Sequence, residues 1–88
     1  MNYEIKFHND ALKYLQKQDK AARNRILDHL NILAENPRHP ELDIKKMQGV
    51  NDRYRLRIGS FRIIYSIHDN ELIVIIIKMG SRGDIYKS

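Results

Sequence analysis

Two stretches of alternating residues on either side of Gly59-Ser60 constrain the fold of this chain more than any other feature. In the first, "RYRLRI" (residues 53–58), arginine occupies every second position, with Tyr, Leu and Ile between. A period of two places alternate side chains on opposite faces of a β-strand. The second, "FRIIYSI" (residues 61–67), follows a dipeptide that suits a two-residue hairpin turn. The sequence therefore predicts a hairpin whose first strand has a cationic face and an apolar face.

The predicted turn also sets the register of the hairpin. Counting outward from the turn places Arg57 directly opposite Arg62, with Cβ atoms roughly 5 Å apart, and Arg55 on the same face. Like charges that face each other destabilise a sheet. Two interpretations remain open. Either a phosphate bridges the guanidinium groups, whose planar fork fits two oxygens, or the arginines extend into solvent or pair with acidic side chains nearby.

The N-terminal half predicts one strand and two helices. Residues 3–7 alternate between apolar and polar and indicate a strand. Asn9 or Asp10 can cap a first helix, and Asp19 can cap a longer second helix. The apolar stripe of the second helix consists of Ala22, Ile26, Leu30 and Leu33. Pro37 cannot continue that helix, so we expect it to end just before this residue.

The C-terminal half predicts a meander of three strands. Asp69-Asn70 suits a second tight turn, followed by the apolar stretch "LIVIIIKM" (residues 72–79). We therefore expect a small α+β fold in the order β-α-α-β-β-β. It has an antiparallel sheet with the two N-terminal helices packed on one face. Residues 1–88 are expected to form a single domain.

The composition of the chain indicates which ligands and partners to expect. The chain has no cysteine, and its four histidines show no metal-ligand spacing, so we expect neither a metal nor a cofactor. No apolar run approaches the ~20 residues that span a bilayer, and the first ten residues lack a signal-peptide core. We therefore expect a cytoplasmic protein that does not bind membranes. A net charge of +5 favours an anionic partner.

The arginine face is expected to continue into an apolar surface. Ile64 lies on that face, and with a tight turn at Asp69-Asn70 so do Ile73, Ile75 and Ile77. These side chains are too apolar to face water unaided. Either another part of the chain or a partner therefore covers them, and we favour a protein partner.

Three stretches resemble the RelE/ParE superfamily of bacterial toxins: "IKKMQG" (44–49), "YRLRIGSFRIIYSI" (54–67) and "MGSRGDIY" (79–86). The expected order of helices and strands also fits that superfamily over nearly the whole chain. The RelE branch implies the toxin of a type II toxin–antitoxin system, a metal-independent endoribonuclease that cuts mRNA on the ribosome and inhibits translation. In that chemistry a 2′-hydroxyl of the RNA attacks the adjacent phosphate, and a cognate antitoxin holds the toxin inactive.

The resemblance implies the site residues as well. Arg55 and Arg57 match the basic pair on the family's strand, and Arg62 matches the arginine after its aromatic residue. Arg82 and Tyr86 match the arginine and the tyrosine of the tail, which completes the predicted catalytic set. The predicted substrate-binding residues are Lys45, Lys46 and Phe61, the last standing where tyrosine is common.

One departure from the family concerns proton transfer. The strand pair of the best-known relatives is lysine, and one of these lysines is thought to act as base. Arginine is in general a permanently charged side chain, so arginines at these two positions stabilise charge but make poor bases. Glu41 is a candidate general base. The other candidates for moving the proton are Lys45, Lys46, Tyr86 and the bound ribosome.

Two alternative functions stay open at this point. A ParE-like protein would inhibit DNA gyrase and have no nuclease activity. A degenerate toxin would have lost its activity and kept its antitoxin interface. An antitoxin partner is expected in every case, and its contact surface is predicted to include Ile64, Ile75 and Ile77.

Overall fold

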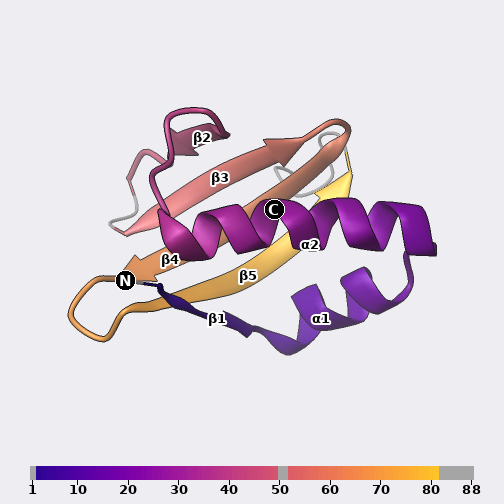
Figure 1. Cartoon of the computed structure of the whole chain (residues 1–88), viewed down its shortest axis with the longest axis horizontal. Coiled ribbons are helices and arrows are strands. Elements are labelled where there is room, and N and C mark those ends of the chain that lie inside the picture. Colours follow the sequence, from indigo (N-terminus) through magenta and orange to yellow (C-terminus); the bar gives the residue numbers. More distant parts are fainter. Residues whose placement is uncertain (1, 50–51, 82–88) are drawn as a thin grey trace.

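A five-stranded sheet carries both helices on one of its faces (Figure 1). The computed structural model describes residues 2–49 and 52–81. The elements in chain order are β1 (Glu4–Phe7), α1 (Asn9–Gln16), α2 (Lys20–Glu35), β2 (Asp43–Lys46), β3 (Arg53–Ile58), β4 (Phe61–His68) and β5 (Ile73–Ser81). The predicted α+β fold with two helices on one sheet face is confirmed.

The strands lie in the order β1-β5-β4-β3-β2, so the first two strands of the chain form opposite edges of the sheet. All pairs are antiparallel except β1 with β5, which is parallel. The exception arises because α1 and α2 carry the chain from one edge, across the face of the sheet, to the other edge. The sequence analysis did not predict β2, since "DIKK" is only four residues long and contains one apolar residue.

The β3–β4 hairpin has the predicted register. Arg57 pairs with Arg62 and Ile58 with Phe61, around a turn in which Gly59 has φ +58°. The second turn is longer than predicted, because His68 pairs with Ile73 and leaves four residues between the strands. Both turn lengths are even, so Ile73 still lies on the same face as the arginines.

The helix face of the sheet buries the core. Ile26, Leu30 and Leu33 of α2 are almost fully buried, as their spacing predicted. The fully buried strand residues beneath them include Leu56, Ile63, Tyr65, Val74 and Ile76.

The helix caps differ in quality. The Asp19 carboxylate accepts a hydrogen bond from the Ala22 N–H at 2.8 Å, so the predicted cap of α2 is confirmed. The predicted cap of α1 at Asn9 or Asp10 is wrong. The helix already includes both residues, and His8 occupies the cap position without a side-chain hydrogen bond. Asp10 instead places its charge in the first turn, where it interacts favourably with the helix dipole.

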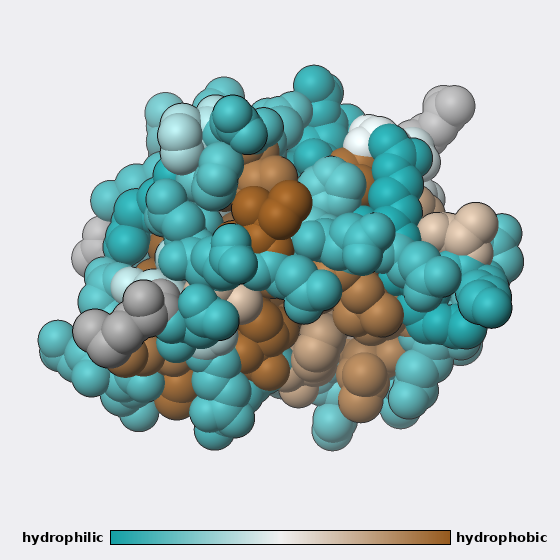
Figure 2. Space-filling view, in the orientation of Figure 1, coloured by the Kyte–Doolittle hydropathy of each residue, from teal (hydrophilic) through white to brown (hydrophobic). Residues whose placement is uncertain are grey.

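The outer surface on the helix side is mostly polar (Figure 2). Leu12, Leu27 and Ile32 are the large hydrophobic residues that remain exposed on the helices, each at 37%. Neither α1 nor α2 is long and apolar enough to cross a membrane.

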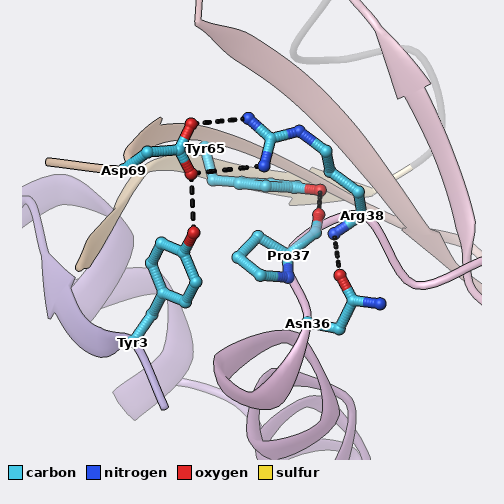
Figure 3. A network of polar contacts seen from close by, with 6 residues as sticks. All are labelled: Tyr3, Asn36, Pro37, Arg38, Tyr65 and Asp69. Atoms are coloured by element: carbon cyan, nitrogen blue, oxygen red, sulfur yellow. Dashed lines mark hydrogen bonds and ion pairs between the residues drawn. The ribbon is translucent and has the colours of Figure 1, made fainter. Parts of the chain in front are cut away.

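A polar network ties two loops to the start of β1, at the end of the sheet away from the β3–β4 turn (Figure 3). The buried Tyr65 hydroxyl donates to the Pro37 carbonyl at 2.8 Å, and burial raises the pKa of this hydroxyl. Arg38 pairs with Asp69 at 3.0 Å, and the Tyr3 hydroxyl donates to the same carboxylate at 2.6 Å. The two partners hold the pKa of Asp69 below its usual value, Arg38 contributing most. The network therefore joins β1, the α2–β2 loop and the β4–β5 loop.

We expect Tyr65→Phe to lower the free energy of unfolding by about 1 kcal/mol, because it leaves the buried Pro37 carbonyl without its donor. For a domain of this size the change corresponds to a fall in Tm of about 4–8 °C. Tyr14→Phe is the matched control, since the Tyr14 hydroxyl makes no hydrogen bond within residues 2–49 and 52–81. Equal melting temperatures for the two variants would contradict the assigned role of the hydroxyl.

The β3–β4 turn also contacts α2. A Cβ atom at Gly59 would lie 2.9 Å from Nη2 of Arg25, and the positive φ at this residue strains any side chain. Gly49 has φ +78° but open space around its Cα. Both glycines therefore have a positive φ, but only Gly59 has the Arg25 side chain close to the position of a Cβ atom.

We expect Gly59→Ala and Gly49→Ala to be destabilised by about 1 kcal/mol each, since the left-handed backbone sets the penalty. The Arg25 guanidinium is the far end of a flexible side chain, so it can move away at little further loss. Chemical denaturation of both variants measures the comparison. A loss several kcal/mol larger for Gly59→Ala would show that Arg25 is fixed against the turn.

Candidate functional site

The face of the sheet opposite the helices, here called the open face, carries the arginines. Alternation along β3 turns Tyr54, Leu56 and Ile58 toward the helices, and Arg55 and Arg57 therefore lie on the open face. On β4 the same face carries Arg62, directly across from Arg57. The hairpin thus brings together three arginines that the sequence predicted as one cluster.

A cavity of about 470 Å³ lies beside this cluster. Its lining residues are Lys45, Lys46, Met47, Gln48, Arg55 and Arg62. β2 completes it, because Lys45 pairs with Arg55 in the β2–β3 register. Four of its six lining residues are cationic and none is acidic, so the cavity attracts anions. The structure therefore brings the predicted substrate-binding lysines next to two of the predicted catalytic arginines.

Asp43 is the residue of the site that the sequence analysis missed. Its Oδ1 lies 3.1 Å from Nη2 of Arg55, and its Oδ2 lies 2.7 Å from Nε of Arg57. One carboxylate therefore offsets part of the repulsion among the arginines, and the interpretation of acidic pairing is correct for these two. The spacing of Asp43 and Lys45 puts both on one face only once "DIKK" is known to be a strand, which its four residues do not indicate by themselves.

Arg62 has no acidic partner among the described residues. Its Nη1 donates to the carbonyl oxygens of Phe61 at 3.3 Å and Gly59 at 3.4 Å. Within the described part of the chain, no carboxylate lies within ion-pair distance of Arg62 or of the two cavity lysines. Arg62, Lys45 and Lys46 are therefore the cavity cations that an incoming anion can bind without displacing a carboxylate of the described residues.

The other predicted site residues are placed differently. Phe61 packs on the helix face, where its ring meets that of Tyr14 edge to face at 6.4 Å, so it does not line the cavity. Glu41 is exposed in the loop before β2, and its N–H donates to Nδ1 of His39. It does not line the cavity either. Arg82 and Tyr86 lie outside the described residues.

The predicted apolar surface lies next to the arginines. Ile64 pairs with Arg55 across the hairpin, is 6% exposed, and does not belong to the core on the helix side. Ile73 and Ile75 of β5 lie half-buried on the same face. Ile77 is the extra residue of a bulge between β4 and β5 and is also half-buried. We call Ile64, Ile73, Ile75 and Ile77 the isoleucine surface.

Several known proteins are similar to this chain. Residues 5–86 match a family profile described as "ParE toxin of type II toxin-antitoxin system, parDE". An Escherichia coli protein named "Putative RelE-like toxin protein" is 37% identical over 90 residues, covering 98% of this chain and 92% of that protein. "mRNA interferase toxin RelE" of E. coli K12 is 29% identical over 84 residues, covering 93% and 85%. The archaeal RelE–RelB complex from Pyrococcus horikoshii OT3 has a TM-score of 0.82 and 34% identity, covering 96% and 99%.

Proposed function

Because this chain belongs to the RelE/ParE family of toxins from type II toxin–antitoxin systems, we propose that it is an endoribonuclease that cuts mRNA on the ribosome and thereby inhibits translation. The observation that carries the proposal is the cationic cavity that Arg55, Arg62, Lys45 and Lys46 line on the open face. The relative named as an mRNA interferase supports the same activity.

In this reaction the protein must position the reacting groups of the RNA and stabilise the negative charge that develops on the phosphate. The 2′-oxygen of one nucleotide forms a bond to its 3′-phosphorus, and the bond from phosphorus to the 5′-oxygen of the next nucleotide breaks. The 2′-hydroxyl loses a proton and the leaving 5′-oxygen gains one. The phosphorane that forms in between carries extra negative charge, which Arg55 and Arg62 stabilise from the cavity wall.

Proton transfer needs a group other than arginine, because an arginine side chain keeps its charge at physiological pH. Lys45 and Lys46 line the cavity and have exchangeable ammonium protons. Lys45 is the better placed of the two, because it pairs with Arg55 on the open face. Glu41 is a weaker candidate, since it does not line the cavity.

The second candidate function is inhibition of DNA gyrase without nuclease activity. The family profile that matches residues 5–86 is that of ParE toxins, which favours this alternative. The ion pairs of Asp43 with Arg55 and Arg57 also fit gyrase inhibition, because they offset the charge of these two arginines without a bound nucleic acid. The two candidates differ in target and can be separated by experiment.

The test of function uses ribosomes stalled with a defined mRNA codon in the A site. Primer extension should reveal new 5′ ends at that codon when the purified protein is added. Arg62→Ala should reduce the cleavage rate by about 10²-fold, as for removal of one donor from an oxyanion site. Arg53→Ala is the matched control, since Arg53 is exposed on the same face of β3 but does not line the cavity.

Two results would contradict the nuclease proposal. Intact mRNA together with inhibited gyrase supercoiling would assign the ParE-like function. If Arg62→Ala cleaves mRNA at the rate of the unsubstituted protein, then the cavity is not the site of cleavage.

We also propose that a RelB-like antitoxin covers the isoleucine surface. The solved structure from Pyrococcus horikoshii OT3, which is similar to this chain, is a complex of RelE with RelB. The isoleucine surface is apolar and lies on the open face, outside the core on the helix side. Ile64 is itself buried, and Ile73, Ile75 and Ile77 are half-buried. The Arg55–Ile64 pair joins this surface to the arginine cluster. A partner bound there would block the cavity sterically, which explains inhibition without any change of fold.

Ile75→Asp should weaken the complex with the antitoxin at least tenfold, because burial of an isoleucine side chain contributes roughly 1.5–3 kcal/mol. Titration calorimetry with the purified antitoxin measures the change. Ile32→Asp makes the same substitution at an exposed isoleucine of α2 and should leave the affinity as it is. Equal affinities for the two folded variants would place the interface elsewhere.

A further inference from the structure

Arg55 and Arg57 are neighbours on one face of β3 but have different surroundings. Arg55 lines the cavity, whereas Arg57 does not. The Arg55 side chain is 20% exposed, and that of Arg57 is 50% exposed. The basic pair that the family resemblance treats as one unit is therefore split by the structure.

Asp43 connects the two arginines. It pairs with Arg57 across the β2–β3 ladder, and each of its carboxylate oxygens contacts a different guanidinium. The 2.7 Å contact uses Nε of Arg57. An arginine whose Nε already binds a carboxylate has lost one of the two edges through which it grips a phosphate bidentately.

The Asp43 contact also accounts for how Arg55 is held. Nη2 of Arg55 reaches Asp43, while its Nε is buried without a hydrogen-bond partner within the described residues. The guanidinium is thus fixed through its Nη2 end, and within residues 2–49 and 52–81 no other side chain forms a hydrogen bond with it. If Asp43 is lost, Arg55 keeps its charge but loses the contact that orients it.

Building on the proposed function, we propose that Arg57 and Asp43 form a positioning pair that holds Arg55 in the cavity, and that Arg57 does not bind the scissile phosphate. The phosphate is then bound by Arg55, Arg62 and Lys45. Arg57 acts on the reaction only through Asp43, and Asp43 only through Arg55.

Single-turnover cleavage of A-site mRNA tests the pair through non-additivity. Arg57→Gln and Asp43→Asn should each reduce the rate about tenfold or more, as expected when a catalytic group is displaced. The double variant should be no slower than the slower single variant, because both changes release the same guanidinium. Asp43→Glu should recover most of the rate. Arg62→Gln removes an independent contact. In the double variant of Arg57→Gln and Arg62→Gln, the factors by which the two single changes reduce the cleavage rate should therefore multiply.

Two kinetic outcomes would overturn the proposal. If Arg57→Gln is as harmful in the Asp43→Asn background as alone, then Arg57 contacts the RNA directly. If Asp43→Asn cleaves faster than the unsubstituted protein, then Asp43 is a counterion that restrains the site. Thermal melting of each variant separates these effects from loss of folding.

A binding measurement tests the same pair without any cleavage. Inorganic phosphate is titrated into the isotope-labelled protein while the NMR signals of the arginine Nε–H groups are followed. The Arg62 signal should shift and saturate, and the Arg57 signal should keep its position because its Nε stays in the ion pair with Asp43. A larger shift at Arg57 than at Arg62, or no shift at Arg62, would refute the proposal. Failure of ribosomal cleavage with the expected NMR result would instead refute the nuclease function alone.

Discussion

The pairing of β3 with β4 through a two-residue turn is the constraint on which the rest of the structure depends. Its register decides which side chains of the two strands share a face, and a shift of one residue would exchange the core with the arginines. Leu56 and Ile63 meet beneath the helices, while Arg57 and Arg62 meet on the open face. The same hydrogen bonds therefore determine both the stability of the domain and the geometry of its cationic cluster.

Concentrating positive charge on one sheet face carries an electrostatic penalty that the fold reduces only in part. Asp43 offsets repulsion for Arg55 and Arg57, and it does so from β2, an edge strand of four residues. Arg62, Lys45 and Lys46 have no carboxylate partner within the described residues. An anion that entered the cavity would relieve the remaining repulsion.

The two faces of the sheet serve different purposes. The helix face is closed by α1 and α2 and by the polar network around Tyr65 and Asp69 at its far end. The open face places the isoleucine surface and the cationic cavity side by side. Under the proposed function, a protein partner on the first and an RNA on the second would compete for space, and the antitoxin would control the toxin by occluding its site.

The sequence by itself determined the hairpin, its register, the two helices and the isoleucines on the arginine face, because these follow from periodicity and turn chemistry within short segments. It did not determine β2, which is too short and too polar to show a period. Without β2, Asp43 could not be matched with Arg57, nor Lys45 with Arg55. Only the tertiary structure decided that Arg55 lines the cavity while Arg57 pairs with Asp43 outside it. Those outcomes depend on contacts between strands distant in the sequence, whose alignment no local pattern encodes.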